Sequence, residues 1–412
     1  MCKVSGSATL KNLQASSLFH ATTGAFYTLS RARFNQQWAR WSKELPGIKP
    51  YYAVKCNPDP LLISWIHQAG GAFDCASTRE MKIVCDNLGK EFQADKILFA
   101  NPCKTPSDIS MARDMGVPCV TVDSAEEVSK MYVSIYRPET LIRVAVDDVG
   151  AACPFSAKFG IEPGKVEEIV KEAKLCATPI VGLSFHVGSG SKNPRAFADA
   201  IHSCADIWNS LQKRGFVDHP PLLDIGGGWS HCPTQFTEQA THTMDALETL
   251  AKSGKRPARV IAEPGRFFAA SSHSLYVRVM GKKPALKGNG FRYTLDESIY
   301  GQFSCIPFDH ATPRMARLRM MYDRPRRCVP ATFFGRTCDS LDWIGTSEST
   351  EELFVGDWLY VPDMGAYTTS TSTEFNGFPR PRVELSDAEP DADDLVWLEN
   401  MKFPLASMLH VS

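Results

Sequence analysis

The sequence has no run of about 20 consecutive apolar residues, which a membrane-spanning helix would need. It also has no excess of one charge, because 45 Lys and Arg face 46 Asp and Glu, so no net field attracts nucleic acid or an anionic membrane. Low-complexity linkers and short repeats are missing as well. The 43% of hydrophobic and 22% of charged residues exclude a mainly disordered chain.

The 13 cysteines include no CxxC pair, the spacing typical of zinc and redox sites, and we predict no metal site. They are scattered through 412 residues, so we expect mostly reduced, buried thiols. The first residues lack the apolar core of a secretory signal. We therefore expect a cytoplasmic protein of two or three domains, with no nucleic-acid or membrane partner.

Short apolar runs recur along the chain from about residue 50, and each ends in small or polar residues. The eight runs are residues 51–55, 72–77, 97–102, 119–124, 141–147, 180–189, 222–228 and 260–265. Segments with helical periodicity lie between them, such as residues 78–88 and 165–177. Buried strands that alternate with helices indicate an α/β fold with a parallel sheet, and eight units over about 215 residues predict a (β/α)8 barrel.

The alternation stops after Arg266. Later strand-like runs, at residues 275–280, 291–295 and 358–361, predict a mainly β domain at the C-terminal side. The run at residues 26–29 is expected to pair with that domain. The predicted division is therefore an N-terminal segment (1–30) that joins the β domain, the barrel (31–271) and the β domain (272–412).

Unusual residues for a strand end follow several of the predicted barrel strands. Lys55 ends the first run. The alternative to a catalytic role is that it is an ordinary solvated charge at a strand end. Asp74, His186 and Glu263 follow at the ends of later runs. Reactive groups of such barrels gather at the C-terminal ends of the strands, so we expect these side chains at one site.

Glycine-bearing turns also follow the last barrel strands, at residues 188–190, 226–228 and 263–266. Each turn alone is weak evidence, but together with Arg266 they predict a phosphate site. A nucleophilic Lys, a phosphate site and a lone carboxylate indicate pyridoxal 5'-phosphate. The Lys would form the Schiff base, and the carboxylate would pair with the pyridinium nitrogen.

Eight blocks occur in a fixed order: YAVKCN, FDCAS, ANPCK, FHVGSG, DIGGG, AEPGRF, TCDSLD and DMGAYT. From about residue 25 to 378 the chain resembles the ornithine decarboxylase family, the fold-type III pyridoxal-phosphate decarboxylases. The resemblance implies a barrel followed by a β domain of the alanine racemase type. It also implies α-decarboxylation of ornithine or a similar diamino acid, giving carbon dioxide and a polyamine-type amine.

The resemblance assigns roles by motif. Lys55 would hold the cofactor covalently, His186 would stack on its ring, and Glu263 would pair with its ring nitrogen. Asp74 and Glu80 would support the Lys and the His. Cys338 would return a proton to the substrate carbon. The phosphate would be held by Ser189, Gly226, Gly227, Gly228, Gly265, Arg266 and Tyr367.

The substrate side of the family pattern is only partly kept. Asp309 and Asp339 would bind the distal amine of the substrate, but Phe308 stands where the family has a Tyr. Cys338 and Asp339 would reach the barrel of the opposite subunit, so a homodimer with composite sites is implied.

Other departures from the family pattern, which we expect near the substrate, are Pro154 for an Arg, residues 296–301 for an NDG-type turn, and Trp229 and Trp343 after two of the blocks. These changes favour, equally with ornithine, a modified amino acid of alkaloid metabolism, as for the loline decarboxylase. A catalytically inactive, antizyme-inhibitor-like binding protein is less favoured, because such proteins lose residues that are kept here. For single residues, His186 could be a core histidine, Cys338 a buried thiol and Glu263 a helix-capping partner.

Overall fold

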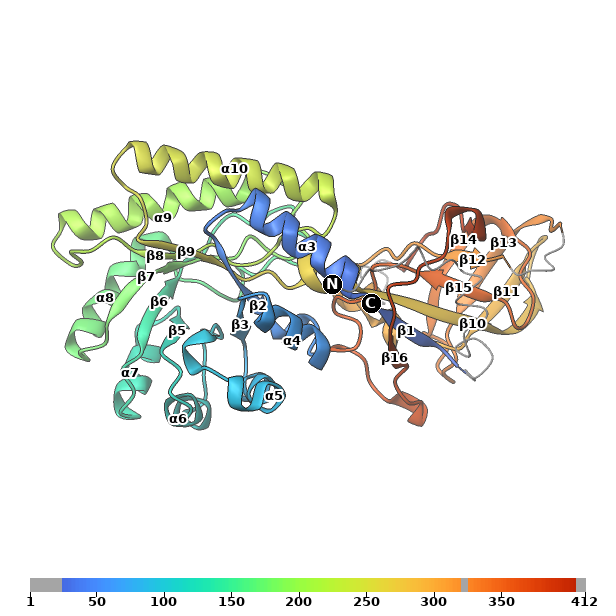
Figure 1. The fold of residues 1–412 in the computed structure, drawn as a ribbon, viewed down its shortest axis with the longest axis horizontal. Helices are drawn as coiled ribbons and strands as arrows, with labels where there is room; N and C mark the ends of the chain where they lie inside the picture. Colours follow the sequence, from blue (N-terminus) through green and yellow to red (C-terminus); the bar gives the residue numbers. More distant parts are fainter. Residues whose placement is uncertain (1–23, 320–324, 405–412) are drawn as a thin grey trace, which may run out of the picture. The chain divides into compact units, whose positions relative to one another are not determined.

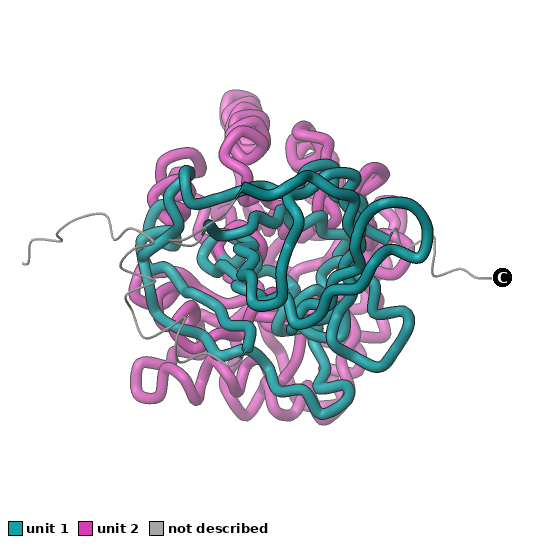
Figure 2. Tube along the Cα trace, turned by 90° about the vertical axis from the view of Figure 1, so that its right-hand side faces the viewer, with its two compact units in different colours: residues 1–36, 269–412 teal, residues 37–268 magenta. Residues whose placement is uncertain are grey.

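The computed structural model describes residues 24–319 and 325–404. The chain divides into two compact units, shown in different colours in Figure 2. One unit comprises residues 37–268, and the other comprises residues 1–36 with 269–412. Each unit is described by itself.

Eight parallel strands close a barrel in the unit of residues 37–268. The strands are β2 Lys49–Ala53, β3 Ala72–Cys75, β4 Ile97–Phe99, β5 Cys119–Val122, β6 Glu139–Arg143, β7 Ile180–Ser184, β8 Leu222–Asp224 and β9 Arg259–Ala262. The barrel closes where β9 pairs with β2, with Lys49 opposite Ile261. The predicted (β/α)8 barrel is therefore confirmed, and all its strands end at the same rim.

Helices surround these strands (Figure 1). They are α3 Arg31–Glu44, α4 Pro60–Gln68, α5 Thr78–Leu88, α6 Pro106–Asp114, α7 Ala125–Val133, α8 Val166–Leu175, α9 Ala196–Lys213, α10 Pro233–Lys252 and α11 Arg266–Ser272. Side-chain oxygens of Asp59, Ser77, Thr105 and Ser124 accept backbone N–H groups at the starts of α4 to α7, which fixes where these helices begin.

The inside of the barrel is filled by side chains. One buried cluster takes a residue from each of seven strands: Tyr51, Ala72, Leu98, Cys119, Leu141, Leu222 and Ile261. The barrel is therefore a packed core and not a pore, which leaves its rim as the place for chemistry.

The other unit is mainly β. Its strands are β1 Phe26–Leu29, β10 His273–Pro284, β11 Phe291–Leu295, β12 Ala316–Leu318, β13 Cys328–Phe334, β14 Trp343–Glu351, β15 Trp358–Val361, β16 Arg382–Leu385 and β17 Leu395–Trp397, with one short helix, α12 Cys305–Asp309. The sheet order is β14-β13-β11-β10-β15-β12-β17, and β1 pairs with β10 and β16. The predicted mainly β domain is thus confirmed.

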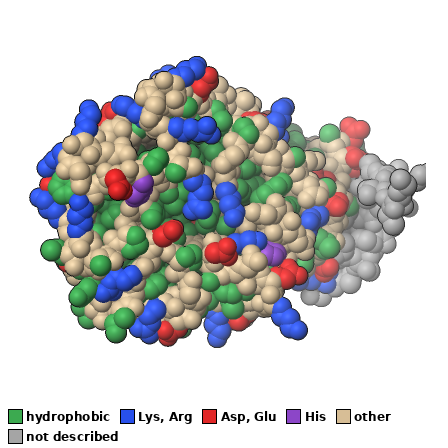
Figure 3. All heavy atoms as spheres, turned by 60° about the vertical axis from the view of Figure 1, so that its left-hand side comes forward, with side chains coloured by type: hydrophobic (Ala, Val, Ile, Leu, Met, Phe, Trp, Pro, Cys, Tyr) green, Lys and Arg blue, Asp and Glu red, His purple; other side chains and the backbone are tan. Residues whose placement is uncertain are grey.

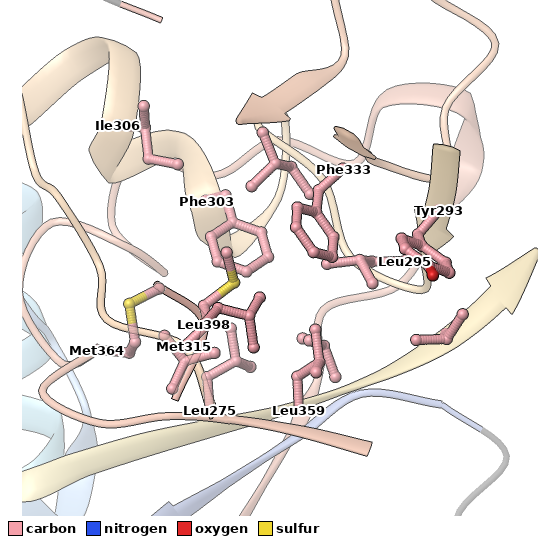
Figure 4. Packing of buried hydrophobic residues seen from close by; sticks show 14 of the residues in the cluster. Leu275, Tyr293, Leu295, Phe303, Ile306, Met315, Phe333, Leu359, Met364 and Leu398 are labelled. Atoms are coloured by element: carbon pink, nitrogen blue, oxygen red, sulfur yellow. The ribbon is translucent and has the colours of Figure 1, made fainter. Parts of the chain in front are cut away.

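Buried apolar residues join the parts of this second unit. Figure 4 shows Leu275 of β10, Phe333 of β13 and Leu359 of β15 in one cluster with Phe303, which lies next to α12. Short 3-10 helices complete the described elements: η1 Val54–Cys56, η2 Gly89–Glu91, η3 Ala94–Lys96, η4 Pro163–Lys165, η5 Gln302–Ser304, η6 Phe375–Gly377 and η7 Ala392–Asp394.

Among the described helices, none combines the length and the apolar composition that crossing a bilayer requires. On the face shown in Figure 3, Lys and Arg side chains are spread out with Asp and Glu among them. This distribution agrees with the nearly balanced charge of the sequence.

Candidate active site

Lys55 lies at the barrel rim, in η1, directly after β2. Its Nζ forms an ion pair with Oδ2 of Asp74, which stands on the neighbouring strand β3 opposite Ala53. Asp74 is fully buried, whereas the Lys55 side chain is 37% exposed. The carboxylate therefore holds the amine in place while one side of it stays accessible.

Glu80 lies in the first turn of α5, close to this ion pair. The Ala76 N–H donates to Glu80 Oε2 (2.8 Å), and the Glu80 N–H donates to Ser77 Oγ (3.2 Å). These two bonds fix the start of the helix, since Ser77 is its N-cap residue. Burial raises the pKa of Glu80, and the charge of Lys55 opposes that shift.

His186 follows β7. Its Nδ1 accepts the Gly188 N–H at 2.9 Å, so a neutral ring carries its proton on Nε2. Burial, with the charges of Arg143 and Lys55, lowers the pKa of His186 well below its usual range. The edge of Phe155 lies against the ring, with centroids 4.8 Å apart. The site thus offers a neutral, oriented imidazole that suits stacking on a flat ring.

The glycine loop after β8 leaves no room for side chains. A Cβ on Gly226 would lie 2.0 Å from the Phe185 carbonyl oxygen, and one on Gly227 would lie 2.7 Å from His186 Nε2. Gly226 also has a φ of +61°, in the left-handed region. Gly265 is enclosed in the same way, since its Cβ would lie 2.9 Å from Cys56 Cβ.

Gly228, the third residue of the loop, has a φ of +108°. The guanidinium of Arg266, the first residue of α11, donates to Ser189 Oγ at 2.9 Å. A guanidinium, a hydroxyl and a glycine backbone without side chains therefore lie at the same rim. Together these groups suit the binding of a phosphate.

Glu263 follows β9 and is tied to the glycine loop, because its N–H donates to the Gly226 carbonyl at 2.8 Å. Burial, with the nearby charges of Asp224 and Asp74, raises the pKa of Glu263 well above its usual range. A carboxyl that is shielded from water and surrounded by other acids is stabilised in its ionised form by a cationic partner, such as a protonated ring nitrogen.

Asp224 is a site residue that the sequence reasoning missed. It ends β8, its Oδ1 accepts the Gly226 N–H at 2.9 Å, and burial raises its pKa to about 7. Its Oδ2 is buried without a hydrogen-bond partner in the described structure. The signal was present in the sequence, because Asp224 closes an apolar run directly before three glycines.

Cys338 and Asp339 lie in the other unit, in the loop between β13 and β14. Cys338 is exposed, and its backbone N–H donates to Asn376 Oδ1 at 2.9 Å. Asp339 accepts the Leu341 N–H on Oδ1 (3.0 Å) and the Tyr300 hydroxyl on Oδ2. These two bonds lower the pKa of Asp339, so it stays ionised. The link from Tyr300 to Asp339 was not predicted.

The remaining predicted residues of this unit are Phe308, Asp309 and Tyr367. Phe308 and Asp309 end α12, where Phe308 is 65% exposed and Asp309 is 8% exposed. Tyr367 is half-buried and has a φ of +53°, which is unusual for a residue other than glycine.

One of the sequence departures does not belong to the substrate side. Trp229 is 1% exposed and stacks on Phe197, with ring centroids 3.8 Å apart. Its Nε1 donates to the Gly226 carbonyl at 3.0 Å. The expectation that Trp229 lies near the substrate is therefore wrong, because its indole is part of the core behind the glycine loop. Pro154 is exposed, and Trp343 is half-buried at the start of β14.

Known proteins resemble this chain in sequence and in fold. Residues 31–270 match the family described as "Pyridoxal-dependent decarboxylase, pyridoxal binding domain". The chain belongs to this family. The ornithine decarboxylase of Schizosaccharomyces pombe is 37% identical over 383 residues, which cover 90% of this chain and 85% of that relative.

Two solved decarboxylase structures have the same fold. The arginine decarboxylase of Paramecium bursaria Chlorella virus has a TM-score of 0.83 at 33% identity, over 91% of this chain and 100% of that chain. The lysine/ornithine decarboxylase of Vibrio vulnificus, solved with putrescine, has a TM-score of 0.79 at 30% identity, over 92% and 98%.

The cofactor of this pyridoxal-dependent decarboxylase is pyridoxal 5'-phosphate. The barrel rim fits that cofactor. The amine of Lys55 suits the aldehyde, the carboxyl of Glu263 suits the ring nitrogen, and Arg266 with the glycine loop suits the phosphate. The predicted family, enzyme class and cofactor are thereby confirmed.

Proposed function

We propose that the protein removes the α-carboxyl group of ornithine or of a similar basic amino acid, giving a diamine and carbon dioxide. The observation that carries this proposal is the Lys55–Asp74 ion pair at the barrel rim, together with the nearby carboxyl of Glu263. The similar proteins act, by their names, on ornithine, arginine or lysine, all of which have a distal cation.

The predicted residues would divide the work among them. The cofactor supplies the electron sink for the pair of electrons that remains when carbon dioxide leaves. Lys55 would bind it, His186 would stack on its ring, and Glu263 would hold the proton on the ring nitrogen. Ser189, Gly226, Gly227, Gly228, Gly265, Arg266 and Tyr367 would hold its phosphate.

Two side chains of the second unit would act on the substrate in this proposal. Asp339 is oriented by two hydrogen bonds and is ionised, so it would bind a distal ammonium group together with Asp309. The exposed thiol of Cys338, next in sequence, would return a proton to the α-carbon after decarboxylation.

A modified amino acid is the second candidate substrate. Phe308 is exposed on α12 and lacks the hydroxyl group of the family's Tyr, and Pro154 beside Phe155 lacks the family's guanidinium. Both changes reduce polarity, which favours a bulkier or less polar side chain. The binding-protein alternative finds no support, because Lys55, Glu263 and Arg266 are all present.

Carbon dioxide release from a panel of ornithine, lysine, arginine and N-substituted diamino acids tests the substrate. Turnover of an unmodified basic amino acid with the highest kcat/KM supports the first candidate. A higher value for an N-substituted compound supports the second. No release from any member, with the cofactor bound, would overturn the proposed function.

The site of cofactor attachment is tested directly by chemistry. Lys55 is the lysine at the rim paired with a buried carboxylate, so borohydride reduction and peptide mapping should find the pyridoxyl group on Lys55. Lys104 is the matched control, because it also forms an ion pair with a buried carboxylate, Glu127, and burial lowers its pKa to about 8. Finding the label on Lys104 would contradict the assignment.

A head-to-tail homodimer with composite sites and a cytoplasmic location complete the proposal. The exposed position of Cys338 supports a role in a site on a second subunit. Cys119 and Cys204 are buried free thiols, and burial raises the pKa of each to about 12. Such unreactive thiols suit a reducing compartment.

A further inference from the structure

The turn after β11 departs from the family's NDG pattern, and a buried carboxyl lies at its start. It runs over residues 298–304 and leads into α12. Internal bonds hold it together, since the Gly301 and Phe303 N–H groups both donate to the Ser298 carbonyl at 3.0 Å. The turn carries Tyr300, whose hydroxyl donates to Asp339.

Glu297 lies at the base of this turn, with an exposure of 0%. Its Oε1 accepts the Ser298 N–H at 2.8 Å and also lies against the backbone of Gly301. One carboxyl oxygen therefore contacts the backbone on both sides of Tyr300. A buried acceptor that holds one amide and lies against the next backbone segment restricts the residues between them.

Gly301 makes this arrangement possible. A Cβ on Gly301 would lie 1.9 Å from Glu297 Oε1, so only glycine lets the carboxyl reach into the turn. The Glu297 Oε2 atom is buried without a hydrogen-bond partner in the described structure. The charged groups that act on Glu297 are Arg336 and Asp296, and burial raises its pKa to about 7.

We propose that Glu297 is the positioning residue of the substrate-side acid. By accepting the Ser298 N–H and lying against Gly301 it fixes the turn, and the turn holds Tyr300 against Asp339. Glu297 thus acts through Tyr300 and does not touch the substrate. This inference rests on the proposed function in one respect, namely that Asp339 binds the distal cation.

Two variants of similar shape, Glu297→Met and Glu297→Gln, test whether an acceptor is needed at the position of Oε1. Glu297→Met removes the acceptor, so KM for the best basic substrate should rise about tenfold, the size of one lost hydrogen bond, with kcat and cofactor affinity unchanged. Glu297→Gln keeps an amide oxygen in place of Oε1 and should keep the wild-type KM. A wild-type KM in Glu297→Met, or an equal loss in Glu297→Gln, would overturn the proposal.

Pairing each variant with Tyr300→Phe tests whether Glu297 acts through Tyr300. Once the bond to Asp339 is gone, Glu297→Met should raise KM no further, and additive effects would refute the route. If Glu297→Met does not fold, Gly301→Ala replaces it, because its Cβ displaces the same carboxyl. An unchanged KM in Gly301→Ala would then refute the proposal.

A titration that needs no substrate distinguishes failure of this inference from failure of the proposed function. The bond to Asp339 raises the pKa of Tyr300 above its usual value. Subtracting the absorbance titration of a Tyr300→Phe counterpart isolates this tyrosine. Its ionisation should move to lower pH in Glu297→Met but not in Glu297→Gln. No shift in Glu297→Met would overturn the inference, whatever the enzyme decarboxylates.

Discussion

At the scale of single residues, the barrel rim gathers charges that could not be buried separately. Asp74 and Asp224 are fully buried and Glu263 is half-buried, and each would carry a large desolvation cost if it were ionised alone. Lys55 and Arg143 offset part of this charge. The cluster therefore makes the free energy of folding less favourable, and the cofactor that it fits explains why these charges lie together.

Asp339 carries the residue-scale prediction about substrate. Asp339→Asn removes the charge but keeps the shape, so kcat/KM for a basic substrate should fall by about 30-fold or more while the spectrum of the bound cofactor stays the same. Steady-state kinetics and absorbance measure both. Asp391→Asn, at an exposed carboxylate of the same unit, is the matched control and should behave as wild type.

Phe308→Tyr tests the same pocket in the opposite direction. If ornithine is the substrate, the added hydroxyl should leave turnover level or raise it. If a bulkier or less polar substrate is used, the hydroxyl should reduce its turnover. An Asp339→Asn enzyme with nearly unchanged kcat/KM would show that the distal group is not held by this acid.

At the scale of elements, the glycine loop after β8 is the part of the rim with the least freedom. Gly226→Ala would place a Cβ 2.0 Å from the Phe185 carbonyl, so the loop must move and cofactor affinity should fall by at least about tenfold. Fluorescence titration with pyridoxal 5'-phosphate measures this loss.

Gly254→Ala controls for backbone strain in that experiment. Gly254 also has a positive φ, +72°, but no atom lies within 4 Å of the Cβ position. The Gly254→Ala variant should have a slightly lower melting temperature and an unchanged cofactor affinity. Equal affinity losses in both variants would mean that general destabilisation, and not the loop, explains the effect.

Many helices and strands of both units could be predicted from sequence because their signals are local. Each strand is a short apolar run that ends in a polar or small residue, and residues 78–88, 291–295 and 358–361 were predicted with the bounds of α5, β11 and β15. The turn at residues 298–304 could not be predicted, since its shape depends on a buried Glu297 and on the space that Gly301 leaves. Trp229 was misplaced for a similar reason, because only the packing against Phe197 shows which way the indole points.

At the scale of the whole molecule, the predicted site residues are divided between the two units. Except for Tyr367, the residues predicted to bind the cofactor are at the barrel rim of residues 37–268, whereas Cys338 and Asp339 belong to the unit that includes residues 269–412. In the proposed function the reaction would use groups from both units, and in the proposed homodimer these would come from different subunits.

Subunit mixing tests that arrangement. Lys55→Ala and Cys338→Ala should each be inactive as homodimers, since one lacks the cofactor attachment and the other the proton donor. After random exchange of equal amounts, half of the dimers are mixed and each has one intact site, so about a quarter of wild-type activity should return. Exchange is followed independently with a differently tagged partner. If exchange is complete and no activity returns, each subunit builds its site from its own residues. A mixture of Lys55→Ala with Asp74→Asn is the matched control, because both changes fall on the same barrel rim and no mixed dimer gains an intact site.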